Sequence, residues 1–578
     1  MPGPRRRRRG RLRGWDFLRF AGDLARDPAR ELERPEARRH EQRHGDGDRQ
    51  PVAPARHERD HARHEREHHG HHQDLAVQHA GSMPPRAALT PPLRGADSFA
   101  HTYTGAVTDA EFNDAPQRAS TPRATGSPGA SGTPEDASTR HADSAEGRFH
   151  VVELPERFDP RVLLNGATAS AVSAYYERPD QDLVLAGIGV AARIMAPAGL
   201  GATALREPAR QILGAWDGSA RQVLRPRLLG GFAFDDAAPG SAHWAGFDAG
   251  WLLLPRMLFI RERGVSGVVL APDTDREELY TLLADLAARD PAEREASVGD
   301  TPPLRVLWDV NRPALLMGVA SVAADIRSGE YEKAVLAATR EMEAERPIEP
   351  GVALARLREG YPTCHLFSYR AGDGIFLGAS PEQLAGLRDG RITTLGLAGS
   401  MRRGQTPEED EELGDALLNS VKDRIEHTIV VRALREGLAD LGANLHAPNQ
   451  PELFRLQNIQ HLATEVTAEA RPGVDVLDVV ERLHPTPAVG GWPTPIAREV
   501  IGRYERFDRG WYAGPVGWID AAGDGEFAVG LRSALVRGAR AWLFAGAGIM
   551  GDSDPEAELA EIELKFRPLT TALGGGQL

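Results

Sequence analysis

The stretch FAVGLRSALVRGARAWLFAGAGIMGDSDPEAELAEIELKFRPLTTAL, residues 527–573, decides the class of fold. Two apolar runs, 527–536 and 541–550, flank a short turn at 537–540, and this pattern predicts a β-hairpin. A helix is expected over 555–573, because Pro555 suits a first helical turn. A hairpin followed by a long helix favours an α+β fold over a doubly wound parallel sheet.

The same alternation of apolar runs and helices continues upstream. Apolar runs at 375–387 and 391–400 flank the turn 388–390, which predicts a second hairpin, and one long amphipathic helix is expected over 407–441. Strands are expected near 182–190, 228–235 and 251–260, and helices near 274–288 and 319–327. We therefore predict an α+β (α/β) fold, a single large domain over residues 149–578 with antiparallel sheets flanked by helices. We find no internal repeat and no phosphate-binding loop.

The first 148 residues have a different composition. Residues 1–80 contain 19 arginines, 14 acidic residues and 10 of the 19 histidines, and residues 114–147 are rich in Pro, Ser, Thr and Gly. Such segments bury too little apolar surface to offset the entropy of ordering, so residues 1–148 are predicted to be a disordered extension. The histidines lack the regular spacing of a structural metal site, and Met83 is a candidate alternative start.

Composition excludes several classes of protein. The net charge of −14 argues against binding to nucleic acid or to an anionic membrane. No apolar run approaches the roughly 18–20 residues of a spanning helix, and the basic start lacks the apolar stretch of a secretion signal. The lone cysteine, Cys364, excludes an internal disulfide and a cysteine zinc site. We expect a cytoplasmic protein, monomeric by default.

Lysine usage is unusual. Of the 69 basic residues only three are lysines: Lys333, Lys422 and Lys565. In a chain that otherwise uses arginine, a lysine can mark a position that needs a compact ammonium or a releasable proton. For any single lysine, retention by chance is an equally good explanation.

Two expected helices each carry a pair of carboxylates. Asp423 and Glu426, and likewise Glu558 and Glu561, are three residues apart and therefore share a helix face. Two such faces together can hold Mg²⁺. On spacing alone, an ordinary solvated helix face is the commoner explanation.

Three further segments carry polar groups or glycines suited to ligand binding. Glycines in 546–549 allow backbone N–H groups to approach an anion, and Arg532 on the preceding strand can pair with a carboxylate. A tight turn and an exposed arginine are the plainer alternatives. His484 lies in a Pro-rich loop, where a lone histidine is more often a structural hydrogen-bonding group.

The order of these segments matches a known family. The matching motifs are KAVLA (333–337), FLGASPE (376–382), LAGS (397–400), KDRIEH (422–427), HPTPAVGG (484–491), YAGPVGW (512–518), GLRSALV (530–536), GAGI (546–549) and PEAELAEIELK (555–565). In these motifs the chain resembles the chorismate-utilising enzymes, and among them the isochorismate synthases. The resemblance covers about residues 150–575 and implies one domain of large antiparallel sheets that acts on chorismate with Mg²⁺.

The resemblance also implies roles for individual residues. Lys333 matches the base that activates water to attack C2 of chorismate, and Glu382 matches the acid that protonates the departing C4 hydroxyl. Glu426 and Glu561 match the direct Mg²⁺ ligands, and Asp423 and Glu558 match outer or water-mediated ligands. The remaining matches are substrate-binding positions: Arg532 and Lys565 for carboxylate, Gly546 and Gly548 as backbone donors, Tyr512 as a lining residue, Ala398 of the LAGS segment, and His484 near the reacting ring.

Small differences separate the reactions of this family. Anthranilate-forming members typically carry Gln where Lys333 stands, and aminodeoxychorismate-forming members carry Lys where Ala398 stands. Salicylate synthases, which go on to eliminate pyruvate, are the nearest alternative, and HPTPA argues against them only in part. A catalytically silent relative with a metal- or partner-binding tail is the alternative from a different class. Isochorismate feeds menaquinone, siderophore and salicylate pathways, and no residue chooses among them.

Overall fold

The computed structural model describes residues 148–216, 218, 223–235, 237, 239–289 and 303–574. All of these belong to one compact unit. The predicted disorder of residues 1–148 therefore lies outside the described residues, apart from Arg148 itself. The domain boundary at residue 149 stays a prediction.

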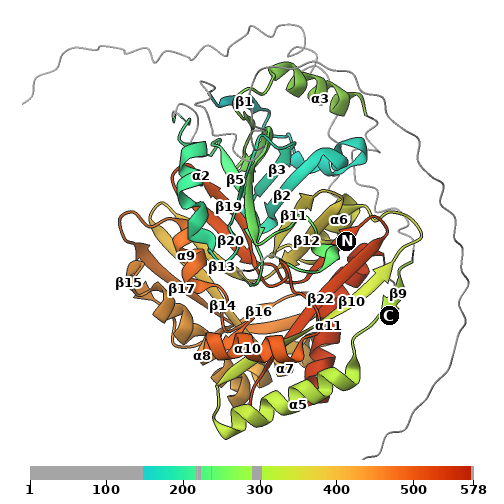
Figure 1. Ribbon diagram of the computed structural model, residues 1–578, viewed down its shortest axis with the longest axis vertical. Helices are drawn as coiled ribbons and strands as arrows, with labels where there is room; N and C mark the ends of the chain where they lie inside the picture. Colours follow the sequence, from blue (N-terminus) through green and yellow to red (C-terminus); the bar gives the residue numbers. More distant parts are fainter. Residues whose placement is uncertain are drawn as a thin grey trace, which may run out of the picture. The chain divides into compact units, whose positions relative to one another are not determined.

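In the described ranges, twelve strands form one antiparallel sheet, here called sheet A (Figure 1). In spatial order they are β1 (His150–Leu154), β8 (Val265–Leu270), β7 (Met257–Glu262), β3 (Leu183–Ile188), β2 (Val172–Arg178), β11 (His365–Ala371), β12 (Gly374–Ser380), β21 (Ser533–Arg537), β22 (Arg540–Ile549), β10 (Lys333–Glu343) and β18 (Gly491–Trp492), with β9 (Arg305–Trp308) also paired to β10. The predicted turn at 537–540 is confirmed, because Arg537 pairs with Arg540 across β21 and β22.

Ten further strands of the described residues form a second antiparallel sheet, sheet B. In spatial order they are β15 (Gly442–His446), β17 (Ile459–Ala470), β14 (Arg391–Arg402), β13 (Gln383–Arg388), β20 (Gly525–Val529), β19 (Pro515–Asp520), β5 (Arg227–Phe232), β6 (Gly250–Leu254) and β4 (Ala192–Met195), with β16 (Glu452–Arg455) also paired to β17. The predicted turn at 388–390 joins β13 to β14. Asp389 and Gly390 both have positive φ there, as tight hairpins require.

The helices lie on the sheets. They are α2 (Arg206–Leu213), α3 (Arg276–Ala288), α5 (Arg312–Ser328), α6 (Pro350–Gly360), α7 (Pro407–Asn419), α8 (Val421–Leu438), α9 (Val476–Leu483), α10 (Thr494–Tyr504) and α11 (Pro555–Leu573). The last helix has the predicted bounds. The single helix predicted over 407–441 is wrong: Ser420 is extended, accepts a hydrogen bond from the Asp423 N–H and so begins a new helix, α8.

Three apolar runs predicted as continuous strands are also wrong, because each passes from one sheet to the other. The run 251–260 divides at Pro255 into β6 and β7, and the run 375–387 divides at Pro381 into β12 and β13. Proline lacks the N–H that a central strand must donate. The run 527–536 divides at Arg532, a non-glycine residue with φ 47°, into β20 and β21.

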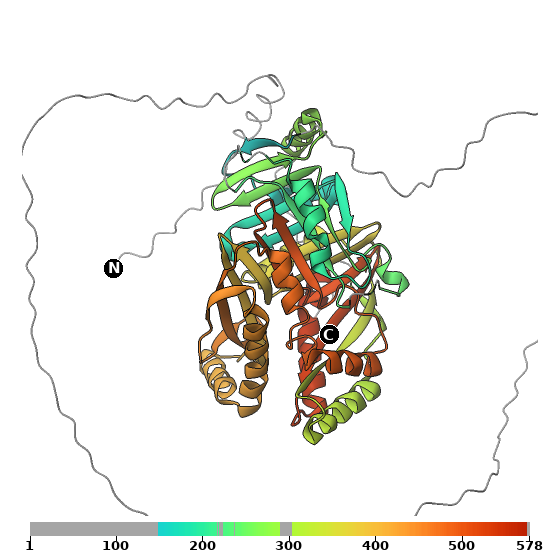
Figure 2. The ribbon, with the colours of Figure 1, turned by 60° about the vertical axis from the view of Figure 1, so that its left-hand side comes forward.

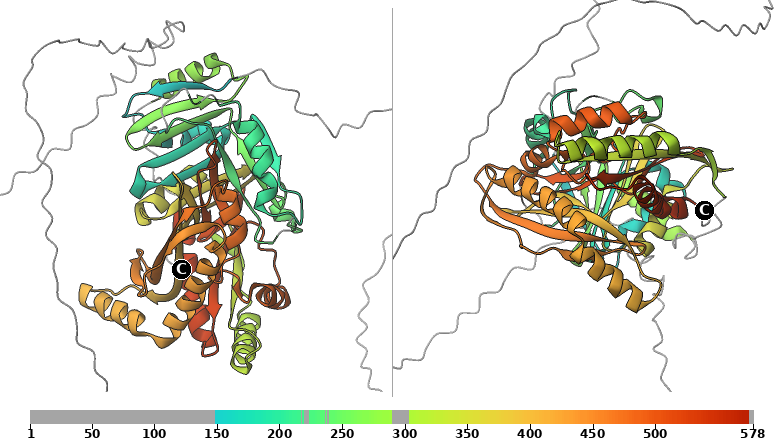
Figure 3. Two further views of the ribbon diagram at one scale, coloured as in Figure 1. Left: turned by 90° about the vertical axis from the view of Figure 1, so that its left-hand side faces the viewer. Right: turned by 90° about the horizontal axis from the view of Figure 1, so that it is seen from below.

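An aromatic core joins the two sheets. Trp251 of β6 packs against Trp511 with ring centroids 4.8 Å apart, and Tyr369 of β11 lies edge-on to Trp251. On its other face sheet A packs against α6 and α11, and α5 lies beside α10 (Figure 3). Among the helices of the described ranges, none is both long enough and apolar enough to cross a membrane.

Candidate active site

A pocket open to solvent, about 690 Å³ with the solvent at its mouth included, lies between the two sheets and the helices α8 and α11. Sheet A contributes β10 and β22, and sheet B contributes β14 and β17. Figure 2 shows α8 (tan) and α11 (dark red) on opposite sides of this region.

Nine of the thirteen predicted site residues line this pocket. They are Glu382, Ala398, Glu426, Tyr512, Arg532, Gly546, Gly548, Glu561 and Lys565. Lys333 contacts the lining residue Glu426, Asp423 lies against the lining residue Gly399, and Glu558 is one helical turn before Glu561 on α11. Segments more than 200 residues apart in the chain therefore meet at one place.

The LAGS segment of β14 contains a β-bulge. The register of β14 against β17 shifts between Ala398 and Ser400, and Gly399 between them has φ 74°. A Cβ at residue 399 would lie 2.9 Å from the Cβ of Asp423, so only glycine fits against α8. The bulge turns Ala398, Gly399 and Ser400 toward the pocket.

Lys333 begins β10 and its side chain is completely buried. Its Nζ lies 2.8 Å from Oε1 of Glu426 on α8. Gly548 on the neighbouring strand leaves room for this ion pair, because a Cβ at residue 548 would overlap Glu426 and lie 3.0 Å from Cε of Lys333. A lysine–glutamate pair is thus enclosed beside the pocket.

Glu382 occupies the corner where the chain leaves β12 of sheet A and enters β13 of sheet B. Its carboxyl is buried, and Thr486 Oγ1 donates a hydrogen bond to Oε1 at 3.3 Å. Burial raises the pKa of Glu382 to about 7, although Lys333, Thr486 and Lys565 each act to lower it. About half of these carboxyls therefore hold a proton near neutral pH.

Arg532 is at another corner between the sheets, with its guanidinium buried at the pocket wall. Its Nη2 lies 3.3 Å from Nε2 of His461, and its Nη1 has no hydrogen-bond partner among the described residues. Since arginine can only donate, Nε2 of His461 accepts, and the ring proton lies on Nδ1, 3.2 Å from the Gly399 carbonyl. Burial and then Arg532 lower the pKa of His461 to about 3, consistent with a neutral ring.

Helix α11 presents Glu561 and Lys565 to the pocket, one helical turn apart. Lys565 Nζ lies 2.6 Å from Oε1 of Glu561 and donates to the Gly546 carbonyl at 2.8 Å. Burial alone would raise the pKa of Glu561, but the charge and hydrogen bond of Lys565, together with His461 and Ser400, outweigh burial and the pKa is lowered. The ring of Tyr512 stacks on Phe544 with centroids 5.3 Å apart and closes this side of the pocket.

Each of the three lysines of the chain is paired with one carboxylate of α8 or α11. Besides the two pairs above, Lys422 Nζ lies 2.8 Å from Oε1 of Glu558. Burial and the neighbouring Glu561 raise the pKa of Glu558, and burial and the nearby Glu426 raise that of Asp423. The four carboxylates of α8 and α11 are therefore close enough to repel one another.

The donor set suits a hard divalent cation, because it consists of carboxylate oxygens whose mutual repulsion a cation would relieve. The distances between these carboxylates do not suit a shared cation as they stand. In the described part of the chain, no three His, Cys, Asp or Glu side chains lie together at the spacing of metal ligands. The lysine partners hold the carboxylates of Glu426, Glu558 and Glu561, so these carboxylates must turn away from the lysines to share an ion.

The structure does not bring His484 into the pocket. Its Nε2 lies 2.9 Å from the Phe234 carbonyl, and its ring packs edge-on against Phe234 beside a separate small cavity at the end of α9. The sequence reasoning missed three polar residues of the site: Ser400, His461 and Thr486. His461 stands in the apolar strand IQHLA of β17, and a histidine in such a strand was a usable signal.

Comparison with known proteins gives a consistent result. The family model described as chorismate binding enzyme matches residues 137–574. The salicylate biosynthesis isochorismate synthase of Pseudomonas aeruginosa is 40% identical over 371 residues, which cover 61% of this chain and 76% of that protein. The isochorismate synthase MenF of Bacillus subtilis is 33% identical over 359 residues, covering 61% and 75%. The structure of the menaquinone-specific isochorismate synthase MenF from Escherichia coli superposes with a TM-score of 0.59 at 27% identity, covering 74% and 95%.

Proposed function

Because this chain belongs to the chorismate-binding enzyme family, we propose that it is an isochorismate synthase. It converts chorismate to isochorismate, an isomerisation that adds water at C2 and releases the hydroxyl of C4. The observation that carries the proposal is Glu382, a buried carboxyl with a pKa of about 7 in the same pocket as the unsatisfied guanidinium of Arg532. A general acid for this reaction must hold a proton near neutral pH.

Arg532 and Lys565 are suited to bind substrate carboxylates. The free Nη1 of Arg532 gains the hydrogen bond that it lacks, and burial makes such a charged pair strong. Lys565 is tied to Glu561 and to the Gly546 carbonyl, so it also fixes the wall that the substrate contacts. Tyr512 lines the pocket on the same side, beside Gly546.

Lys333 and Glu382 divide the proton transfers between them. Lys333 acts as the base: it must first lose its ion pair with Glu426, and as a neutral amine it takes a proton from water as the oxygen bonds to C2. The ring double bond shifts, the C4–O bond breaks, and Glu382 gives its proton to the departing hydroxyl, which leaves as water. One water enters and one leaves, so the atoms balance. The extra proton on Lys333 returns through solvent to Glu382.

The four carboxylates of α8 and α11 are the proposed Mg²⁺ ligands. Glu426 and Glu561 would bind directly, and Asp423 and Glu558 through water, because the first two line the pocket and the other two lie behind it. A bound ion supplies positive charge that neutralises and orients a substrate carboxylate. The monomeric state and the cytoplasmic location remain predictions, as does the pathway that uses the product.

Product analysis tests this proposal. The protein is incubated with chorismate and Mg²⁺, with and without a chelator, beside the variant Lys333→Ala, and the products are separated by liquid chromatography. We expect isochorismate only from the wild type with Mg²⁺. Salicylate with pyruvate would instead assign a salicylate synthase. No product with properly folded protein would leave the silent relative as the better account.

A further inference from the structure

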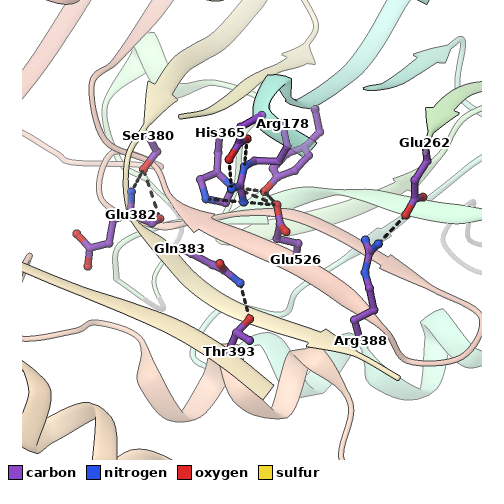
Figure 4. A network of polar contacts seen from close by, with 11 residues as sticks. Arg178, Glu262, His365, Ser380, Glu382, Gln383, Arg388, Thr393 and Glu526 are labelled. Carbon is purple, nitrogen blue, oxygen red and sulfur yellow. Dashed lines mark hydrogen bonds and ion pairs between the residues drawn. The ribbon is translucent and has the colours of Figure 1, made fainter. Parts of the chain in front are cut away.

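A buried polar cluster lies beside the corner that carries Glu382 (Figure 4). It consists of Tyr176 and Arg178 of β2, His365 of β11 and Glu526 of β20, none more than 7% exposed. We call these four residues the inter-sheet cluster, because the first three belong to sheet A and Glu526 belongs to sheet B. The reaction described above uses none of them.

The hydrogen bonds of the inter-sheet cluster have a fixed direction. Arg178 Nη1 lies 3.3 Å from Nε2 of His365, and since arginine only donates, Nε2 accepts and the ring proton lies on Nδ1. Nδ1 lies 2.7 Å from the Tyr176 oxygen, whose hydroxyl donates to Oε1 of Glu526 at 2.8 Å. Arg178 Nη1 also donates to this Oε1 at 3.3 Å, which closes a ring. Burial, and then Arg178, lower the pKa of His365, in keeping with a neutral imidazole.

This ring connects to Glu382 along both sheets. In sheet A, His365 of β11 lies opposite Ser380 of β12 in the strand register. The Glu382 N–H donates to Ser380 Oγ at 3.2 Å. In sheet B, the Val529 N–H donates to the Glu382 carbonyl at 3.0 Å, three residues along β20 from Glu526. The backbone of Glu382 is thus held from both sides, while its carboxyl points away from the cluster (Figure 4).

We propose that the inter-sheet cluster positions Glu382: it fixes the distance between β11–β12 and β20, and so holds the corner from which the carboxyl reaches the substrate. This inference rests on the proposed function. A buried ion pair seldom stabilises a fold more than apolar side chains of the same shape would. Geometry is a different requirement, because a misplacement of about 1 Å at a catalytic group can lower a rate by roughly a hundredfold.

Tyr176→Phe tests the proposal, because it removes one hydroxyl from the ring and keeps the buried aromatic ring. We expect kcat to fall about tenfold while KM for chorismate changes less than about twofold. The charged neighbours of Glu382 are Lys333 of β10 and Lys565 of α11, and both lower its pKa. If the corner loosens and water reaches the Glu382 carboxyl, the effect of burial that raises this pKa becomes smaller. The high-pH limb of the rate profile should therefore move to lower pH by about half a unit or more.

Tyr369→Phe is the matched control. The Tyr369 hydroxyl is also buried on β11 and also crosses between the sheets, donating to the Gly517 carbonyl at 3.0 Å, but it is not part of the ring. We expect a similar loss of thermal stability with unchanged kcat and pH profile. Equal kinetics in the two variants would overturn the proposal.

A second variant and a second measurement separate this inference from the proposed function. Glu526→Gln keeps the shape of the side chain but removes the charge that accepts from Tyr176 and Arg178, and it decides the question in the same way if Tyr176→Phe does not fold. Carboxyl NMR of ¹³C-glutamate-labelled protein, assigned with Glu382→Gln, follows the Glu382 titration without turnover. A pKa lowered by Tyr176→Phe supports positioning, and an unchanged pKa refutes it. Absence of turnover in the wild type would instead count against the proposed function.

Discussion

Replacing Glu382 with glutamine should separate the catalytic use of this residue from its effect on stability. The amide has nearly the same shape as the acid and can still accept the hydrogen bond from Thr486, but it holds no transferable proton. Glu382→Gln should therefore abolish isochorismate formation at every pH. Because the amide cannot ionise, the same substitution should stabilise the fold at high pH.

The size of that stabilisation follows from the raised pKa. The folded value of about 7 lies above the ordinary value of 4.5, so the folded chain keeps a proton that the unfolded chain has already released. The wild type therefore loses stability as the pH rises from about 4.5 to 7, in total about 3 kcal/mol, at about 1.4 kcal/mol per pKa unit. At pH 7 the same shift raises the protonated fraction from about 0.3% to about 50%.

Urea unfolding of wild type and Glu382→Gln at several pH values between 5 and 8.5 measures this difference. The free energy of unfolding of the variant should gain on that of the wild type by about 2.5 kcal/mol across this range, because part of the change lies below pH 5. Other titrating groups are common to both proteins and cancel in the difference. A difference that stays constant with pH would refute the reasoning, because Glu382 would then titrate alike in both states.

Three further changes should act at defined points of the site. Gly548→Ala should lower kcat at least tenfold, because the new Cβ would displace the Lys333–Glu426 ion pair. Gly502→Ala is the control: no atom lies within 4 Å of its new Cβ, so turnover should stay unchanged. Equal effects of the two variants would contradict the close approach of Gly548 to the ion pair. Glu561→Gln should raise the Mg²⁺ concentration needed for half-maximal rate by about tenfold or more, and an identical Mg²⁺ titration would rule out the ligand assignment. Arg532→Lys should raise KM for chorismate by about tenfold or more, because a point charge replaces a planar fork, and an unaltered KM would argue against carboxylate binding there.

The hairpin turns and the last helix could be predicted because their signals are local. Positive φ at Asp389 and Gly390 and the proline at the start of α11 need no distant residue. The corners between the sheets could not be predicted in this way. The apolar run through Pro381 is continuous in hydropathy, and only the packing of two whole sheets determines that β12 ends before Glu382 and β13 begins after it.

The candidate site shows the same division. The scarcity of lysine, which is visible in the sequence, indicated three positions that the structure pairs with carboxylates of α8 and α11. The hydrogen-bonded partners of the site were not visible. His461 reaches Arg532 only through the pairing of β14 with β17, and the contact of Thr486 with Glu382 depends on a loop fold that no local pattern encodes.

Oxygen labelling tests most directly the central claim that Lys333 activates water for attack on C2. Chorismate of natural isotopic composition is converted in water enriched in heavy oxygen, and the isochorismate is examined by mass spectrometry with fragmentation. The account predicts one heavy oxygen atom per product molecule, carried by the hydroxyl at C2, and no such product from Lys333→Ala. Isochorismate that contains no heavy oxygen would show that the C4 hydroxyl itself migrates, and would contradict the account.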